Sequence, residues 1–284
     1  FINKMRSTAR QLHLNSAHIV TASGITNGQA GKLGYSSVAK NDENTMSATD
    51  VARLSQLLLK QYPEILQTTS QSKAWFDKGG HDQTLMNSWN MMLKGESQYD
   101  PALPVDGLKT GTSTAAGGNF VGTVKRNNGD RIITVVMHAR NKKTGDPARF
   151  IQTRHLMNWV YASYQPVRLT AQTFQLSNIK VPMGKSLTAE TTVAKPTTVW
   201  IGRHQNRNQF RSKVLIAKNH REENGLKAPV AANTTVGQVQ LSLAGKPISQ
   251  IDQTGTLKLP IKTINDINQA NWLVRTWRYF WSLF

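Results

Sequence analysis

Apolar residues near the start of the chain recur at helical intervals and predict a first helix over Ile2–Leu14. The residues that would lie near one face of this helix are Ile2, Met5, Ala9 and Leu12. A loop rich in glycine and asparagine follows, from Ser23 to Asn44. The chain therefore begins with one short amphipathic helix and a long polar connection.

A second helix is predicted to begin at Ser47, with Asp50 three residues later. This spacing resembles a capping box in which Asp stands in place of the usual Glu or Gln. Pro63 ends the helical pattern, because proline is poorly tolerated inside a helix. The apolar face, which we assign to the core, consists of Val51, Leu54, Leu57, Leu58 and Ile65.

The middle of the chain predicts a sheet with a helix packed on it. Asn119–Val124 and Arg131–His138 are strand candidates, and the Asn-Gly turn signal within 127–130 predicts a hairpin between them. An amphipathic helix is then expected from Arg149 to Val160. Strands followed by helices in this order indicate an α+β domain.

Beyond Tyr164 the pattern changes to short β-branched runs separated by turn residues, which is typical of an all-β domain. Its strands are expected within Val167–Phe174, Leu187–Ala194, Thr198–Ile201 and Val214–Ala217. We therefore predict a multidomain α+β chain: an α+β domain over 1–165, a small β-sandwich over 166–264, and an amphipathic helix within 265–284.

Composition narrows the function classes. The 284 residues include 38% hydrophobic residues, no cysteine, and a formal net charge of +19. The charge favours a polyanionic partner, but no zinc-finger or RNA-recognition pattern is present, so nucleic acid is not predicted. No cluster has the spacing of a metal site, and no apolar run of about eighteen residues predicts a membrane span. No secretory signal is visible at Phe1.

The most informative stretch is Lys109-Thr110-Gly111 within Val105–Gly117. Lys-Thr-Gly is one of the short motifs that build the site of penicillin-recognising serine enzymes. An Asp-Gly turn signal precedes it, a run of small residues follows it, and two strands come next. With this context, the segment resembles the low-molecular-mass penicillin-binding proteins, which are serine D-alanyl-D-alanine carboxypeptidases of bacterial cell walls.

The resemblance implies a role for each residue of the motif. Lys109 would supply positive charge, and Thr110 would hydrogen-bond the substrate carboxylate. Gly111 would leave room for the substrate backbone to pair as an added strand. The N–H of Thr112 would be an oxyanion donor, and Ser113 would contact substrate. The family requires no metal or cofactor.

The resemblance also implies an arginine for the free carboxylate of the substrate, because a guanidinium fork suits a carboxylate. Arg149 is the residue that matches it. The loop before it, Asn141–Pro147, departs from the family pattern in length, so Arg140 and Arg154 remain alternatives.

The family's nucleophile lies in Ser-x-x-Lys, and a second motif is Ser-x-Asn, both well upstream of Lys-Thr-Gly. Neither is found where the resemblance requires it, so we expect a chain that lacks its N-terminal third. Three internal matches have the wrong context: Ser37–Lys40 and Ser70–Lys73 are polar loops, and Ser88–Asn90 lies in a segment that resembles the family's Asn-x-Asn-x-Leu-Leu.

The C-terminal region extends the resemblance. Leu226–Val230 and Thr235–Ile248 are similar to the all-β domain attached to these carboxypeptidases. The last residues are aromatic and basic, which suits a helix lying in a membrane interface. The residues expected to anchor it are Trp272, Arg275, Trp277, Arg278, Phe280 and Trp281. The alternative is a helix packed on its own β domain.

The resemblance implies a membrane-associated, secreted hydrolase of peptidoglycan biosynthesis, which affects cell wall and cell shape. It would trim D-Ala from stem peptides ending in D-Ala-D-Ala, and β-lactams would inhibit it. We expect it on the outer face of the cytoplasmic membrane of a Gram-positive bacterium. We predict that this chain is inactive alone. The competing hypothesis is a non-catalytic basic surface module that binds wall polymer or anionic membrane.

Overall fold

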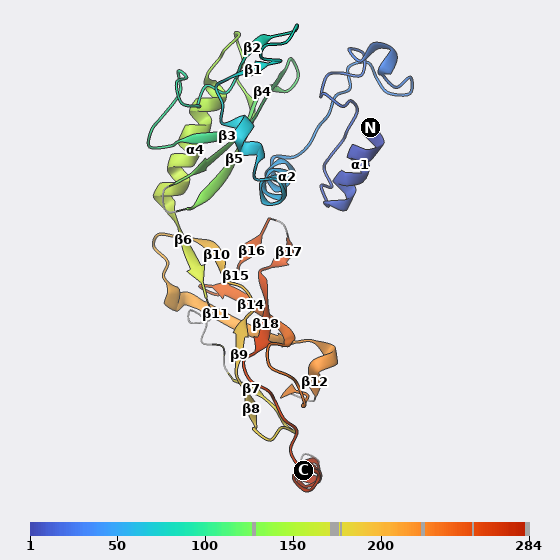
Figure 1. Cartoon of the computed structure of the whole chain (residues 1–284), viewed down its shortest axis with the longest axis vertical. Helices are drawn as coiled ribbons and strands as arrows, with labels where there is room; N and C mark the ends of the chain where they lie inside the picture. Colours follow the sequence, from blue (N-terminus) through green and yellow to red (C-terminus); the bar gives the residue numbers. More distant parts are fainter. Residues whose placement is uncertain (127–128, 171–175, 177, 223–224, 252, 282–284) are drawn as a thin grey trace. The chain divides into compact units, whose positions relative to one another are not determined.

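The computed structural model describes residues 1–284 except 127–128, 171–175, 177, 223–224, 252 and 282–284. The chain forms two compact units, Phe1–Ala162 and Ser163–Phe284. This division falls within a few residues of the domain boundary expected from the sequence. Figure 1 shows the first unit in blue to yellow-green and the second in yellow to red.

The described residues of the first unit form an antiparallel sheet, four α-helices and a short 3-10 helix (Figure 1). The sheet has the strand order β3-β4-β5. The helices and strands of the first unit are α1 (Ile2–Gln11), η1 (Gly31–Leu33), α2 (Ala48–Gln61), α3 (Ile65–Thr69), β1 (Lys73–Phe76), β2 (Thr84–Asn87), β3 (Val105–Ser113), β4 (Gly117–Lys125), β5 (Arg131–Ala139) and α4 (Ala148–Ser163).

Helix α2 begins where the sequence predicts. The side chain of Ser47 accepts a hydrogen bond from the Asp50 N–H at 3.2 Å, which satisfies one of the free donors at the helix start. Asp50 in turn accepts from the N–H and hydroxyl of Ser16, and these hydrogen bonds lower the pKa of its carboxyl. This contact ties α2 to the segment after α1.

Helix α4 packs on β4 as expected, through large side chains that are fully buried. The Phe120 and Phe150 rings meet edge to face, with centroids 5.0 Å apart. Gly122 allows this close approach, because a Cβ there would lie 2.9 Å from Thr153 Cγ2 and 3.0 Å from Met157 Cε. The sheet strands expected at Asn119–Val124 and Arg131–His138 are confirmed. The predicted hairpin turn includes 127–128, which lie outside the described residues.

The sequence analysis missed the hairpin of β1 and β2, in which Trp75 pairs with Leu85. Both strands are short and largely exposed, so they show no alternation of buried and exposed positions. The segment Ser70–Lys73, expected as a polar loop, ends at the first residue of β1.

The second unit is an antiparallel β domain, which agrees with the all-β prediction. Its largest sheet has the order β11-β14-β18-β9, with β15 paired to β14. The elements are β6 (Tyr164–Leu169), β7 (Ile179–Lys180), β8 (Thr188–Ala189), β9 (Thr191–Val193), β10 (Thr197–Gly202), η2 (Arg207–Gln209), β11 (Phe210–Ile216), η3 (Lys218–His220), β12 (Arg221–Glu222), β13 (Gly225–Leu226), β14 (Thr235–Leu243), β15 (Lys246–Pro247), β16 (Ser249–Gln250), β17 (Gln253–Thr256), β18 (Lys258–Thr263) and α5 (Trp272–Trp281).

Strand β14 shows why this sequence forms a half-buried sheet. Val239, Leu241 and Leu243 face the core, while Gln238 between the buried positions is exposed. This period of two places one face of the strand in the core. Of the predicted strand Val167–Phe174, the structure describes residues 167–170. Val167–Leu169 forms part of β6, and the rest of the prediction lies outside the described residues.

We expect Phe150→Ala to lower the free energy of unfolding of the first unit by about 3–5 kcal/mol, because it removes a fully buried ring that packs on Phe120. Chemical denaturation followed by circular dichroism measures this loss. The matched control is Leu33→Ala, since Leu33 is 87% exposed. Equal stability of the two variants would contradict the packing described here.

Candidate functional site

Strand β3, which carries Lys-Thr-Gly, lies at the edge of its sheet. Lys109 pairs with Val121, and Gly111 pairs with Asn119, both on β4. Among the described strands, none pairs with the other side of β3. Lys109, Gly111 and Thr112 are exposed. An extended peptide can therefore add along this edge as a further strand.

The Lys109 ammonium lies over its own strand, where Nζ donates a hydrogen bond to the Thr110 carbonyl. Thr110 is half-buried and Thr112 is exposed. The structure thus presents Lys109 and Thr112 at the surface of one edge strand, in the order that the resemblance predicts. The catalytic roles of Lys109–Thr112 stay predictions.

Arg149 comes from the first turn of α4 and reaches the motif strand. Its Nη1 donates to the Gly111 carbonyl at 2.8 Å and to Thr112 Oγ1 at 2.7 Å, and lies 3.5 Å from the Asn119 carbonyl. The residue is only 6% exposed. The sequence placed Arg149 about forty residues after the motif, and the fold brings the two together.

The two alternative arginines make different contacts. The Arg140 Nε lies 3.4 Å from Asp146 Oδ2, and this arginine side chain is 60% exposed. The Arg154 Nη2 donates to the Gln98 carbonyl at 2.5 Å, and its Nε lies 3.9 Å from Asp100. Of the three, Arg149 is the arginine that hydrogen-bonds the Lys-Thr-Gly strand.

The charge of Arg149 has no carboxylate partner within the described part of the chain, since no Asp or Glu oxygen lies within 4.0 Å of its guanidinium nitrogens. Its Nε is buried without a hydrogen-bond partner. Burial lowers the pKa of the guanidinium and the nearby Asp146 raises it, but arginine remains protonated. A buried, unpaired cation beside an open strand edge suits an anionic ligand.

Asp146 organises the loop that leads into α4. Its carboxylate accepts from the N–H groups of Lys142 and Ala148, both at 3.1 Å. These backbone hydrogen bonds, with a further contribution from Arg140, lower the pKa of Asp146. The carboxylate is therefore ionised at neutral pH and fixes the start of the helix that carries Arg149.

Two polar contacts at the site were missed by the sequence analysis. Ser113 Oγ donates to Glu43 Oε1 at 3.1 Å and accepts from the Ala116 N–H at 2.9 Å. Asp106 and Arg131 form a bidentate pair, with distances of 2.8 and 2.7 Å, that joins β3 to β5. Both contacts link residues that are far apart in sequence and belong to no local motif, so the sequence carried no signal for them.

The internal serine matches have no contact with the motif among the hydrogen bonds of the described residues. Ser37 lies in a turn after η1, and Ser70 is the C-terminal cap of α3. Asn90 is buried, and its Oδ1 accepts from the Met92 N–H, so it supports its own turn. The expectation that none of the three is the catalytic serine element stays a prediction.

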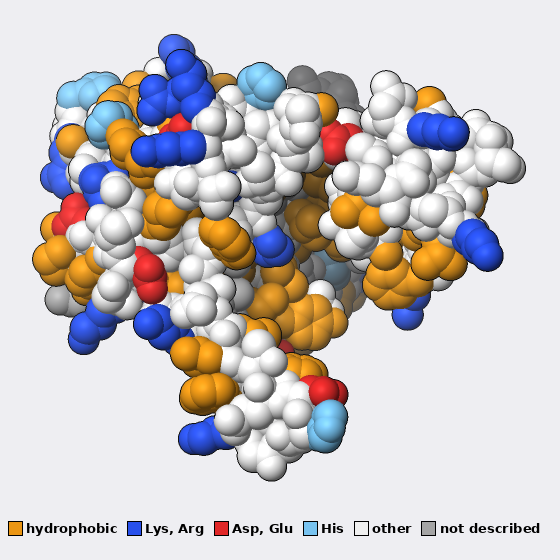
Figure 2. All heavy atoms as spheres, turned by 90° about the horizontal axis from the view of Figure 1, so that it is seen from above, with side chains coloured by type: hydrophobic (Ala, Val, Ile, Leu, Met, Phe, Trp, Pro, Cys, Tyr) orange, Lys and Arg blue, Asp and Glu red, His pale blue; other side chains and the backbone are white. Residues whose placement is uncertain are grey.

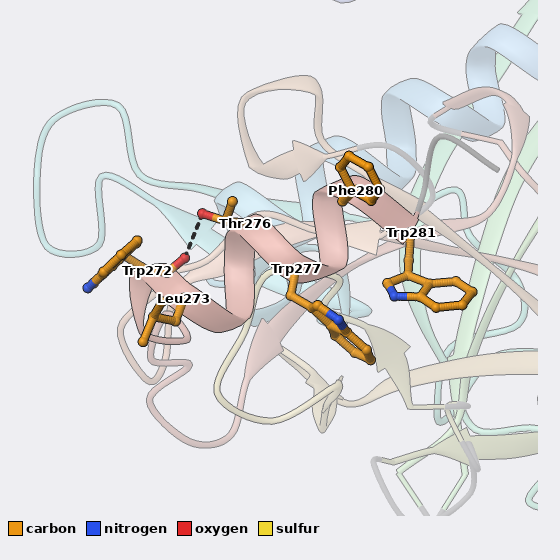
Figure 3. Close-up of a pocket in the computed structure, with 6 residues that line it drawn as sticks. All are labelled: Trp272, Leu273, Thr276, Trp277, Phe280 and Trp281. Carbon is orange, nitrogen blue, oxygen red and sulfur yellow. Dashed lines mark hydrogen bonds between the residues drawn. The ribbon is translucent and has the colours of Figure 1, made fainter.

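The predicted anchoring residues lie on α5, a ten-residue helix about 15 Å long. Figure 3 shows the side chains of Trp272, Trp277 and Trp281 projecting from it, and these three are 64–67% exposed. Arg278 has a different contact: its Nη1 donates to the carbonyls of Pro182 and Gly184. Among the described residues, no helix is long and apolar enough to cross a membrane.

Comparison with known proteins identifies the family of the chain. A family model described as D-alanyl-D-alanine carboxypeptidase matches residues 1–141, and a model of the penicillin-binding protein 5 C-terminal domain matches 164–269. The chain belongs to the low-molecular-mass penicillin-binding proteins of the D-alanyl-D-alanine carboxypeptidase family. The resemblance to this family and the predicted multidomain α+β fold are therefore confirmed.

Curated members of this carboxypeptidase family match along nearly the whole chain. The D-alanyl-D-alanine carboxypeptidase DacA of Escherichia coli is 25% identical over all of this chain and 60% of its own length. DacA of Haemophilus influenzae is 22% identical over 98% of this chain and also 60% of its own length. The chain thus spans about three fifths of the relatives it matches.

Solved structures of penicillin-binding proteins share the fold. A peptidoglycan synthesis regulatory factor (PBP3) from Streptococcus pneumoniae has a TM-score of 0.69 and 26% identity, covering 94% of this chain and 69% of that one. Penicillin-binding protein 5 from Haemophilus influenzae has a TM-score of 0.64 and 20% identity, covering 94% of this chain and 66% of that one.

We expect Arg149→Met to speed amide hydrogen exchange at residues 111–113 of this carboxypeptidase-family chain by about 10-fold. This change corresponds to a loss of about 1.4 kcal/mol in the free energy of local opening. The reason is the loss of its hydrogen bonds to Gly111 and Thr112. Exchange followed by mass spectrometry measures it. Arg154→Met is the control, because Arg154 hydrogen-bonds Gln98 instead. Unchanged exchange at 111–113 in Arg149→Met would contradict the assigned contact.

Proposed function

We propose that this chain forms part of a serine-type D-Ala-D-Ala carboxypeptidase, which removes the terminal D-Ala from peptidoglycan stem peptides. The observation that carries the proposal is the buried Arg149 guanidinium, hydrogen-bonded to Thr112 of the Lys-Thr-Gly strand at 2.7 Å and without a carboxylate partner among the described residues. A peptide with a free carboxyl end could pair along β3 and place that carboxylate near this cation.

The proposed chemistry has two steps. A serine attacks the penultimate D-Ala carbonyl and forms an ester while the terminal D-Ala leaves with a proton on its amine; water then hydrolyses the ester and releases the trimmed peptide. In this scheme Lys109 supplies charge for proton transfer, Thr110 and Arg149 hold the carboxylate, and the Thr112 N–H stabilises the oxyanion. β-Lactams would acylate the same serine. In this scheme the nucleophilic serine belongs to a Ser-x-x-Lys element other than Ser37–Lys40 and Ser70–Lys73.

Fluorescent penicillin tests this assignment. We expect no covalent label on the 284-residue chain, because Ser37 lies in a turn and Ser70 caps the end of α3, and no hydrogen bond of the described residues joins either serine to the Lys-Thr-Gly motif. A polypeptide that adds the Ser-x-x-Lys and Ser-x-Asn segment ahead of residue 1 should be labelled, and Lys109→Ala should slow that labelling by about 100-fold or more.

The matched control is Lys73→Ala, which removes an exposed lysine that is also part of a Ser-x-x-Lys match. It should leave labelling unchanged. A covalent label on the chain itself at Ser37 or Ser70 would contradict the assignment of the motifs, and an extended polypeptide that is never labelled would contradict the proposed function.

We also propose that α5 attaches the protein to the outer face of the cytoplasmic membrane. The support is its row of exposed aromatic residues, together with Arg275 and the net charge of +19. Such a helix lies in the interface with its rings at headgroup depth. Arg278 donates to two carbonyls of the β domain, and these hydrogen bonds would orient α5. We also propose a Gram-positive cell as the source, because exported proteins of such cells often dispense with thiols and this sequence has no cysteine.

Vesicle co-sedimentation tests the attachment. We expect the chain to bind vesicles containing phosphatidylglycerol more tightly than pure phosphatidylcholine vesicles, and Trp277→Ser with Trp281→Ser to weaken binding by about 10-fold or more. Trp89→Ser is the control, since Trp89 is similarly exposed but lies in the first unit. Binding that is unaffected by the α5 substitutions would contradict the proposal.

A further inference from the structure

The largest sheet of the second unit has one face in the core and one in solvent, and the strand register shows which side chains share the outer face. Directly opposed residues of an antiparallel pair lie on the same face. Lys213 of β11 opposes Gln240 of β14, and Gln240 opposes Lys258 of β18. The alternate positions Val239 and Leu241 are buried. Lys213 and Lys258 therefore lie in one row on the outer face, across three strands.

Two further cations extend this row along the strands. Arg211 precedes Lys213 by two residues on β11, and Lys262 follows Lys258 by four on β18, so each pair points to the same face. Neutral polar residues of β14 lie between the two basic strands. We call this surface the basic sheet face; its residues are Arg211, Lys213, Gln240, Ser242, Lys258 and Lys262.

The sequence around β11 has the same bias of charge. Residues 191–221 contain seven Lys or Arg residues and no Asp or Glu. Positive charge is in excess over the whole chain, and Figure 2 shows more Lys and Arg side chains (blue) than acidic ones (red) on one face of it. The basic sheet face differs from this general excess because strand pairing holds its cations in a fixed array.

The cations of the basic sheet face are not neutralised by carboxylates. Among the described residues, no Asp or Glu oxygen lies within 4.0 Å of the Lys213 or Lys258 ammonium, and both residues are exposed. Arg211 donates to two backbone carbonyls, and Lys262 Nζ lies 3.5 Å from Asn233 Oδ1. These oxygens are uncharged. Like charges held on one face repel each other, so an anionic ligand stabilises the array.

We propose that the basic sheet face binds a linear polyphosphodiester, in which short polyols are joined by phosphates, as in a teichoic-acid-like wall polymer. Cations about 7 Å apart along β11 and roughly 10 Å apart between β11 and β18 suit successive phosphates of an extended chain. Gln240 and Ser242 supply donors and acceptors for polyol hydroxyls. This site lies in the other unit from the Lys-Thr-Gly strand, and it does not depend on the proposed reaction.

A membrane and a nucleic acid fit this face less well. Helices at a membrane interface place aromatic or aliphatic side chains in the lipid, as α5 offers, and single-stranded nucleic acids stack on aromatic rings. The uncharged outward positions that remain on the described parts of β11, β14 and β18 are Leu215, Gln238 and Pro260, and none of them is aromatic. The face therefore offers charge and hydrogen bonds without a surface for insertion or stacking.

Calorimetric titration of the 284-residue chain with poly(glycerol phosphate), at about 0.15 M ionic strength, tests the proposal. We expect saturable binding that weakens as salt is added. Lys213→Gln with Lys258→Gln should weaken it by about 10-fold or more. The matched control is Lys180→Gln with Lys185→Gln, which removes two exposed lysines of the same unit outside this sheet. It should change the affinity by less than about 2-fold.

A nuclear magnetic resonance titration with the same polymer should shift the amides of Lys213, Gln240 and Lys258. Absence of binding, equal weakening by the two double variants, or shifts confined to other regions would overturn the proposal. Vesicles of phosphatidylglycerol and a DNA oligonucleotide with as many phosphates are the comparison ligands. If Lys213→Gln with Lys258→Gln reduces the affinity for either of them more than for the polymer, the polyphosphodiester is the wrong partner.

Discussion

The arrangement of the site depends on one buried cation. Arg149 is 6% exposed, and its guanidinium joins the first turn of α4 to Gly111 and Thr112 of β3. Burying a charge without a paired carboxylate is costly, so the fold supports it by other means: hydrogen bonds to carbonyl and hydroxyl oxygens, and Asp146, which fixes the start of α4. The result is a positive charge held beside an open strand edge.

The motif strand is held at both ends while its middle remains open. Asp106 is joined to Arg131 of β5 by two short hydrogen bonds at one end, and Ser113 contacts Glu43 near the other. A bidentate arginine pair fixes geometry as well as adding energy. Between these contacts Lys109 and Gly111 are exposed on the edge, where an extended peptide backbone can pair with the strand.

Local patterns predicted much of this fold. The Ser47 cap, the two strands after the motif and the alternation in β14 each depend on neighbours in sequence, and each is present. The resemblance placed Arg149, and the fold brings it to Thr112. The Asp106–Arg131 pair and the Ser113–Glu43 contact could not be predicted, because they join residues separated by 25 and 70 positions through tertiary packing. The β1–β2 hairpin was missed because it lacks a buried face.

In the proposed enzyme, the Arg149 cation and the β3 edge together form the site for the substrate carboxylate. The most direct measurement is a nuclear magnetic resonance titration of the chain with an acetylated Lys-D-Ala-D-Ala peptide and with the same peptide carrying a C-terminal amide. The account predicts saturable shifts at the amides of Gly111, Thr112 and Asn119 and at Arg149 Nε with the free acid, and far weaker shifts with the amide. Equal responses to the two peptides, or shifts confined to other regions, would contradict it.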